Sequence, residues 1–166
     1  MPWTNAPLVV YHGTDEDAAV RIQAVGIDLA VCRLRADFGR GFYVTSSLHQ
    51  AQQWANQKAL RSPRGGRSAV LTFDLDRDEV ANLDDHLAFV MQGSDFFDFV
   101  RYNRLGNNDH ARRSAVPYDV VYGPVAAYPQ SLTFLNCDQI CFLNQNALSS
   151  LRGPRRDINY GSPIFL

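Results

Sequence analysis

Cysteine is scarce in this sequence, and its spacing excludes the usual cysteine-based frameworks. The 166 residues include three cysteines, Cys32, Cys137 and Cys141, and an odd number without paired spacing argues against a disulfide framework. Cys137 and Cys141 lie four positions apart, but no second Cys/His pair completes a zinc site. The sequence therefore predicts free thiols in a reducing compartment and no bound metal.

Lysine, excess charge and long hydrophobic runs are also lacking. Lys58 is the only lysine, and we attach no mechanism to that. The net charge of −1 gives no general attraction to nucleic acid or membrane. No apolar run approaches the roughly 20 residues of a membrane span, and the stretch MPWTNAPLVVYHG lacks the basic and apolar regions of a signal peptide. We therefore expect a soluble, cytoplasmic protein with no membrane partner.

What the sequence does contain is an ordinary globular composition, with 46% hydrophobic and 20% charged residues. A chain of this length is about one domain, and it buries roughly 70% of its unfolded surface, enough for a core without metal or disulfides. We expect one domain over residues 1–166. Its core is predicted at about residues 8–151, followed by a partly ordered tail rich in Arg, Gly and Pro at residues 152–166.

Five short segments have the composition of β-strands. They are apolar, β-branched or aromatic, and turn residues bound them. The segments are LVVYH at 8–12, FYVT at 42–45, SAVLTFDL at 68–75, YDVVYGPVA at 118–126 and QICFL at 139–143, the last strand expected. Gly123 and Pro124 are expected to bend or end the fourth of these strands.

Helices are predicted between the strands, because capping residues precede apolar positions at helical spacing. A longer helical stretch, interrupted near Gly93, is expected over residues 83–105, and residues 27–40, 61–67 and 107–115 look like loops. The expected caps and apolar faces are Asp15 with Ala18, Ile22 and Val25 before Gly26; Ser46 or Ser47 with Leu48, Ala51, Trp54 and Ala55; and Asn144 for the short helix NQNALSSL. This mixture predicts an α+β fold without regular βαβ winding.

The stretch DFGRGFYVTSSLHQAQQWA, from Asp37 to Ala55, is the most informative part of the sequence. Gly39 and Gly41 permit backbone angles closed to other residues, and so set a sharp turn into the following strand. Glycine also lets a ligand lie close against the backbone. One glycine-rich turn is weak evidence by itself, because most such turns are only turns.

In combination with other motifs, this stretch resembles a known fold. The chain has YHGT at the end of its first strand, FGRGFY before its second, Trp54 eleven positions after Tyr43, and DQICF at its last strand. This set resembles the ADP-ribosyltransferase fold in its histidine–tyrosine–glutamate branch, which includes the catalytic domains of diphtheria toxin and poly-ADP-ribose polymerases. From about Leu8 to Leu151, the chain looks more closely like the bacterial domain-of-unknown-function 3990 family. Those proteins carry D-F-G-x-G-F-Y-x-T, Q-A-x-x-W-A, Y-D-x-V-x-G-P-V-A and D-Q-x-x-F.

The resemblance implies split antiparallel β-sheets with flanking helices and a cleft that holds NAD. By the resemblance, His12 hydrogen-bonds the adenosine-side ribose. The Gly13 backbone holds the nicotinamide amide through a paired N–H and C=O contact, and Thr14 supports it. Tyr43 and Trp54 sandwich the nicotinamide ring. Each aromatic contact is worth on the order of 1–3 kcal/mol, because nicotinamide in NAD is a flat aromatic cation.

The expected catalytic residues are His12, Tyr43 and Gln139. Gln139 falls where the family's glutamate stands, and it keeps the hydrogen-bonding reach but loses the charge that stabilises an oxocarbenium-like state. The neighbouring Asp138 is a carboxylate, but it needs a bulge to turn toward the same side. Gly41 completes the expected NAD contacts with Arg40, whose planar fork suits a phosphate. Arg33 and Arg35 are weaker phosphate candidates.

Each of these residues also has a structural alternative. A histidine at a strand end, such as His12, is often hydrogen-bonded within the fold. Tyr43 and Trp54 have the size of core aromatics, and Arg40 has equal claims as a phosphate ligand and as a solvated side chain. The ordered set of motifs is what favours the functional interpretation.

Three functions remain open. The first is an NAD-dependent mono-ADP-ribosyltransferase, without a metal, that modifies a protein or nucleic-acid target, as the toxin of a bacterial toxin–antitoxin pair with an antitoxin protein as partner. The second is an NAD glycohydrolase, in which water is the acceptor. The third is a non-enzymatic module that binds NAD or ADP-ribose, which the glutamine at position 139 favours. The sequence does not identify the acceptor.

Overall fold

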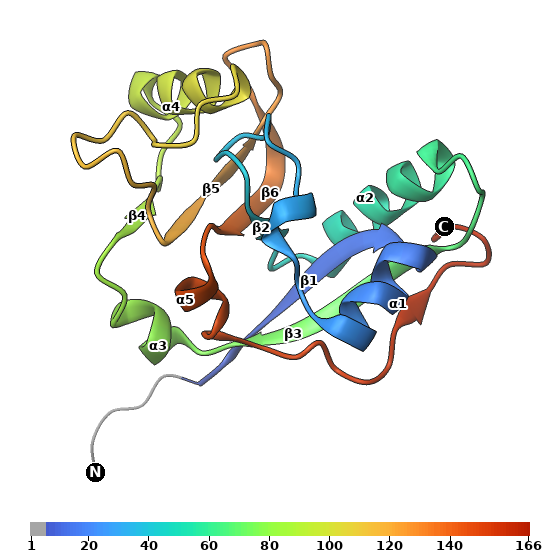
Figure 1. Cartoon of the computed structure of the whole chain (residues 1–166). Helices are drawn as coiled ribbons and strands as arrows, with labels where there is room; N and C mark the ends of the chain where they lie inside the picture. Colours follow the sequence, from blue (N-terminus) through green and yellow to red (C-terminus); the bar gives the residue numbers. More distant parts are fainter. Residues whose placement is uncertain (1–5) are drawn as a thin grey trace. The chain divides into compact units, whose positions relative to one another are not determined.

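The computed structural model describes residues 6–166, and the chain divides into two compact units. Unit 1 contains the described part of Met1–Asp28 together with Val44–Asp78 and Leu151–Leu166, and unit 2 contains Leu29–Tyr43 and Glu79–Ser150. Both units mix strands with helices (Figure 1). The expected α+β class is therefore confirmed.

Unit 1 is built on an antiparallel sheet in which β3 (Ser68–Leu75) is the central strand. It pairs along its whole length with β1 (Leu8–Asp15), from Leu8 opposite Leu75 to Asp15 opposite Ser68. β1 is longer than the run of apolar residues predicted, because Gly13 and Thr14 also pair. The other edge of β1 carries a single antiparallel bridge, between Tyr11 and Thr45.

The two helices of unit 1 begin at the expected caps. The Asp15 carboxylate accepts a hydrogen bond from Ala18 N at 2.9 Å and starts α1 (Glu16–Val25), which ends at Gly26 with φ +87°. The Ser47 hydroxyl caps α2 (Leu48–Arg61) by accepting from Gln50 N at 3.2 Å.

The predicted apolar faces of these helices are only partly correct. α1 buries Ala19 and Ile22, while Val25 is 79% exposed. α2 buries Gln50, Ala51, Ala55 and Ala59. Ile22, Ala51 and Ala55 are therefore buried as expected, whereas Leu48 is 38% exposed and Trp54 is half-buried.

The tail is more ordered than its composition suggests. β7 (Leu151–Arg152) and β8 (Asn159–Tyr160) both pair with β3, so the strand at 139–143 is not the last one, and this expectation was wrong. Near the end of the chain, the Asn56 side chain accepts from Phe165 N at 2.8 Å and donates to Phe165 O at 2.7 Å. The composition of the tail does not reveal these long-range contacts, which are what order it.

Unit 2 contains a second sheet in the order β2-β6-β5-β4. β5 (Val120–Ala126) and β6 (Thr133–Phe142) form an antiparallel hairpin, and β4 (His86–Ala88) runs parallel to β5. β2 (Phe42–Val44) flanks β6. The predicted Gly123–Pro124 break does not end β5, but the register shifts between Pro124 and Ala126.

The predicted helical stretch at 83–105 is half wrong. Residues 86–88 form β4, and only the second half is helical, as α4 (Ser94–Arg104) with Gly93 at its N-cap. Leu83, Leu87 and Val90 have helical spacing, but pairing with β5 overrides that local preference. The short helices α3 (Arg77–Ala81, in neither unit alone) and α5 (Gln145–Leu148) complete the chain, and Asn144 caps α5 as predicted.

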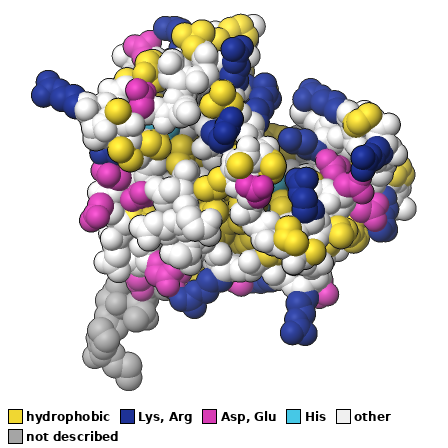
Figure 2. Space-filling model, in the orientation of Figure 1, with side chains coloured by type: hydrophobic (Ala, Val, Ile, Leu, Met, Phe, Trp, Pro, Cys, Tyr) yellow, Lys and Arg dark blue, Asp and Glu magenta, His cyan; other side chains and the backbone are white. Residues whose placement is uncertain are grey.

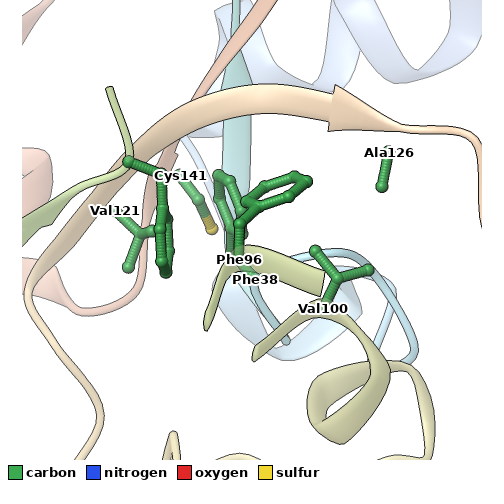
Figure 3. Packing of buried hydrophobic residues seen from close by; sticks show 7 residues of the cluster. Phe38, Phe96, Val100, Val121, Ala126 and Cys141 are labelled. Atoms are coloured by element: carbon green, nitrogen blue, oxygen red, sulfur yellow. The ribbon is translucent and has the colours of Figure 1, made fainter. Parts of the chain in front are cut away.

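The core of unit 2 is centred on Phe38 (Figure 3). Its ring lies 6.2 Å from that of Phe89 and 6.4 Å, edge-on, from that of Phe96. The aromatic residue of the DFG motif is therefore the centre of a buried aromatic cluster. The remaining buried members of the cluster are Val100, Val121, Ala126 and Cys141.

Candidate functional site

Tyr43 fixes the shape of the loop that precedes β2. Its hydroxyl accepts a hydrogen bond from Phe38 N at 2.9 Å and donates one to Gly39 O at 2.8 Å. Burial raises the pKa of this hydroxyl well above its ordinary value, with the Cys141 thiol as the next cause. The predicted catalytic tyrosine therefore braces a loop, and a role for it toward NAD stays a prediction.

Two glycines allow this loop to fold tightly. Gly39 has φ +85°, a backbone conformation that side chains disfavour. A Cβ at Gly41 would lie 2.4 Å from Cys141 Sγ and 2.7 Å from Phe142 O, so any side chain there would collide with β6. With Asp37, Phe38, Gly39 and Gly41 buried, Arg40 is the only exposed residue of the loop Asp37–Gly41.

Asp37 is a buried carboxylate surrounded by hydrogen-bond donors. One oxygen accepts from Arg104 Nε at 2.8 Å and forms an ion pair with Arg104 Nη2 at 2.6 Å. The other accepts from Ala126 N at 3.0 Å and from Gln139 Nε2 at 2.8 Å. This charged group joins the loop to α4, β5 and β6, and sequence reasoning did not identify it as a separate element.

Gln139 belongs to this buried network. Its amide nitrogen donates to Asp37 Oδ2 and, at 2.9 Å, to Pro124 O, and the residue is 3% exposed. Both amide hydrogens are therefore engaged in holding the loop and the β5–β6 hairpin together. The catalytic role expected for Gln139 stays a prediction, and the structure gives this side chain a structural part.

His110 is hydrogen-bonded to the same loop. Its Nε2 bonds Phe38 O at 2.8 Å and its Nδ1 accepts from Tyr118 N at 3.1 Å, so the ring is neutral with its proton on Nε2. Burial lowers the pKa of His110. The neighbouring Asn103 is fully buried, and its Oδ1 has no hydrogen-bond partner among the described residues.

In unit 1, Gly13 is where β1 and α2 come closest. A Cβ at Gly13 would lie 1.9 Å from Ala51 O and 3.0 Å from Ala55 N, so only glycine lets the helix pack there. Because strand side chains alternate, the His12 side chain projects from the opposite face of β1. His12 is half-buried and Thr14 is 4% exposed.

The backbone of Gly13 faces the edge of β1 that β3 does not use. Tyr11 N and O bond Thr45 on that edge at 2.8 and 2.9 Å. Backbone groups alternate between the two edges of a strand, so the N–H and C=O of Gly13 point the same way as those of Tyr11. Gly13 is buried, and no partner is assigned to this N–H and C=O pair within the described residues 6–166.

Trp54 lies on α2 between the helix turns that contact Gly13. Its neighbours Ala51 and Ala55 are fully buried against the sheet with Val70, whereas Trp54 is half-buried. The structure thus brings Gly13 and Trp54 into one unit, on one side of β1. His12 shares that unit but points from the other face, and Tyr43, Arg40, Gly41 and Gln139 belong to unit 2.

Several residues of these networks carried no usable sequence signal. Arg104 and Asn103 are polar residues on α4, and His110 lies in the polar segment expected to be a loop. Asp37 alone had a signal, as the first letter of the DFGRGFY motif. Within residues 6–166 there is no cluster of three or more His, Cys, Asp or Glu side chains suited to a metal, and none of the helices there is long and apolar enough to span a membrane.

Comparison with protein families identifies the family to which the chain belongs. The model of the family described as "Protein of unknown function (DUF3990)" matches residues 8–133, which is well over half of the chain. A search of curated proteins found no match. The matched range covers the Tyr11–Thr14 and Asp37–Ala55 motifs and stops at the first residue of β6.

Proposed function

We propose a function for this chain from the premise that it belongs to the DUF3990 family of proteins of unknown function. We propose that it is an NAD-dependent mono-ADP-ribosyltransferase that modifies a macromolecule, with the ADP-ribosyltransferase-like fold that its motifs resemble. Its substrate is NAD and its second substrate is a protein or nucleic acid. A role as a toxin controlled by an antitoxin is part of the same proposal.

The observation that carries this proposal is the backbone of Gly13. A buried N–H and C=O without partners costs free energy comparable to lost hydrogen bonds. A primary carboxamide offers one acceptor and one donor in the same plane, which satisfies both groups at once. Nicotinamide has that carboxamide, and its aromatic ring suits the half-buried Trp54 on the adjacent helix.

Arg40 is the residue that we propose for contact with a phosphate of NAD. The loop that presents it is held by the Tyr43 hydroxyl and by Asp37, so little backbone ordering is needed when Arg40 binds an anion. A guanidinium binds phosphate oxygens through two parallel hydrogen bonds. We assign Arg40 to a phosphate of NAD and His12 to the adenosine-side ribose.

One observation favours a second function, a module that binds NAD or ADP-ribose without cleaving it. Gln139 replaces the charged catalytic residue of the fold it resembles, and its amide is engaged with Asp37 and Pro124. Both donors of this amide are engaged within the fold, and its neutral oxygen cannot supply the negative charge of a carboxylate. Under the enzymatic proposal, Asp138 is the remaining candidate for the charged catalytic residue, with its carboxylate on the opposite side of β6.

Calorimetry with two dinucleotides tests the Gly13 assignment. Nicotinic acid adenine dinucleotide replaces the carboxamide by a carboxylate, which cannot donate to Gly13 O. We expect it to bind at least about tenfold more weakly than NAD, since each lost hydrogen bond contributes about 1 kcal/mol and the unmatched carbonyl adds a penalty. Equal affinities would remove Gly13 from the nicotinamide site.

Trp54→Ala is the matching protein variant, with Leu60→Ala as control because Leu60 is an exposed apolar residue of the same helix. Loss of stacking is expected to weaken NAD binding by roughly 1–3 kcal/mol in Trp54→Ala and to leave it unchanged in Leu60→Ala. If both folded variants bind NAD like the parent protein, Trp54 is not in the site.

Incubation with labelled NAD separates the three functions. Label on a macromolecule supports the transferase. Release of nicotinamide with free ADP-ribose supports a glycohydrolase, and binding without either product supports the binding module. A protein that neither binds nor consumes NAD contradicts the proposal as a whole.

A further inference from the structure

Charge is distributed unevenly along the chain. The net charge is −1, yet residues 38–73 contain five arginines or lysines and no aspartate or glutamate. This stretch includes all of α2 and the loop that follows it, at residues 62–67. A local excess of one sign attracts a partner of the opposite sign even when the whole chain is close to neutral.

Three of these cations gather in unit 1 at the end of α2. Lys58 and Arg61 are in the last turn of the helix, Arg64 is in the following loop, and all three side chains are exposed. Among residues 6–166 none of the three forms an ion pair, whereas Arg67 is paired with Glu16. Lys58, Arg61 and Arg64 are called the cationic surface below, and Figure 2 shows Lys and Arg side chains where Figure 1 places the end of α2.

The helix dipole accounts for only part of this arrangement. Cations in the last turn of a helix are favoured by its dipole, which explains Lys58 and Arg61. Arg64 lies beyond the helix, in a loop where a Cβ added at Gly65 or Gly66 would have nothing within 4 Å. The cationic surface therefore continues past the helix into a loop whose backbone is open to a ligand.

The rest of the exposed face of α2 is rich in amides. Four exposed residues follow each other at intervals of four positions: His49, Gln53, Gln57 and Arg61. Side chains at this spacing lie on one face of a helix. Glutamine offers both a donor and an acceptor to the edges of nucleotide bases, while arginine and lysine suit phosphates. A helix that binds a membrane surface carries a continuous apolar face instead, whereas the exposed face here has only isolated leucines.

We propose that the macromolecule modified by this protein is a nucleic acid, whose phosphates bind the cationic surface while Gln53 and Gln57 face its bases. This rests on the transferase function proposed above, because it names the class of the second substrate. Trp54 and the cationic surface belong to the same helix and loop. The element that is proposed to stack the nicotinamide therefore also holds the acceptor.

Fluorescence anisotropy with short labelled probes tests the binding directly, without NAD. The probes are single-stranded DNA, single-stranded RNA and duplex DNA of one mixed sequence. Three phosphate contacts release counterions, so the affinity for a single strand is expected to fall roughly 20-fold between 50 and 200 mM salt. The variant Lys58→Gln/Arg61→Gln/Arg64→Gln is expected to bind at least about tenfold more weakly at the lower salt concentration, and to lose most of the salt dependence.

The matched control removes three arginines elsewhere. Arg21, Arg113 and Arg156 are exposed and form no ion pair within the described part of the chain. Arg21→Gln/Arg113→Gln/Arg156→Gln therefore changes the net charge by the same amount, and it is expected to bind the probes like the wild type. Circular dichroism shows that both variants are folded. Calorimetry is expected to give both the wild-type affinity for NAD, because neither set includes a residue assigned to NAD.

Nucleic-acid binding that is lost in the first variant and kept in the control supports the proposal. It is overturned if the wild type binds no probe, if both variants lose binding equally, if the protein binds phosphatidylserine vesicles in place of the probes, or if label from NAD appears on protein alone. A protein that binds NAD but no probe loses its nucleic-acid acceptor and keeps the transferase proposal. A protein that binds the probes but not NAD contradicts the transferase and keeps the cationic surface.

Discussion

Asp37 places a single negative charge at the junction of a loop, a helix and two strands. Its two oxygens accept hydrogen bonds from the Arg104 and Gln139 side chains and from Ala126 N, and each of these partners is a donor. A carboxylate with such partners is stable in a buried position, because every lone-pair direction is matched and one partner is charged. The acidic residue of the DFGRGFY motif is thus explained by the fold before any ligand is considered.

Asp37→Asn removes this charge and leaves Arg104 without its partner. We expect unfolding free energy to fall by about 3 kcal/mol, as is typical when one partner of a buried ion pair is removed. Asp98→Asn is the control, since its ion pair with Arg101 is largely exposed and is expected to contribute less than about 0.5 kcal/mol. Urea unfolding measures both. An equal loss for the two variants would show that Asp37 has no special structural role.

Gln139→Glu tests the same network by adding a negative charge to it. The new carboxylate would lie against Asp37, where the amide now donates at 2.8 Å. Two close carboxylates cannot both ionise without a large penalty, so we expect a loss of roughly 2–3 kcal/mol at neutral pH. The loss should shrink as the pH falls and one carboxyl takes up a proton to replace the lost donor.

Urea unfolding at several pH values checks this prediction. Gln130→Glu makes the same change at an exposed turn position and should leave stability nearly unaltered at every pH. A Gln139→Glu protein as stable as wild type at pH 7 would contradict the network.

His110 is expected to make stability pH-dependent. Burial lowers the pKa of His110 in the folded protein. As the pH falls through about 6.5, the folded protein therefore binds fewer protons than the unfolded chain does. Stability contributed by the neutral ring is therefore complete above that pH and is lost below it, with a slope of at most about 1.4 kcal/mol per pH unit for one proton. Protonation would also abolish the bond from Tyr118 N to Nδ1.

The measurement is unfolding free energy between pH 7.5 and 5.5. His110→Gln is expected to flatten the pH dependence, while His86→Gln, at an exposed position, leaves it as in the wild type. A profile that is identical in all three proteins would remove His110 as its cause.

At the scale of elements, the contact between β1 and α2 depends on one missing side chain. Gly13→Ala would place a methyl group 1.9 Å from Ala51 O, so the helix must move away from the strand. Overpacking of this kind costs about 1–3 kcal/mol or more. We expect a clear fall in melting temperature and, because α2 carries Trp54, a loss of NAD binding.

Gly65→Ala serves as the comparison. Gly65 has φ +68° but nothing within 4 Å of a new Cβ, so its cost is only that of the backbone conformation, about 1–2 kcal/mol. We expect Gly13→Ala to lower the melting temperature more than Gly65→Ala does, and thermal unfolding measures both. A smaller effect at Gly13 would mean that the helix adjusts freely.

Local signals predicted the helices whose N-caps are present and the strands whose own composition is apolar and β-branched. Asp15, Ser47 and Asn144 each start a helix as expected, because an N-cap is decided within one turn. Strand β4 was missed because it has only three residues and lies in a stretch with helical spacing, so that only its pairing with β5 makes it a strand. The site followed the same rule: Gly13 was found from its motif, whereas His110 and Arg104 reach the loop only through the tertiary fold.

For the whole molecule, NAD is expected to stabilise the folded state. A ligand at 100 times its dissociation constant adds about 2.7 kcal/mol to the unfolding free energy, and for a chain of this length each kcal/mol raises the melting temperature by a few degrees. Melting curves with NAD, ADP-ribose and nicotinamide identify which part of the dinucleotide is recognised. If none of the three shifts the curve, the protein does not bind this class of ligand.

The order of the segments in unit 1 has a consequence for synthesis on the ribosome. Unit 1 takes its strands β7 and β8 from Leu151–Leu166, and Phe165 bonds Asn56, so this unit is completed only after residues 151–166 have been made. All segments of unit 2 leave the ribosome earlier. A nascent chain can therefore assemble unit 2 before β7 and β8 are available to pair with β3. A translation stall near residue 150 would leave β3 partly unpaired.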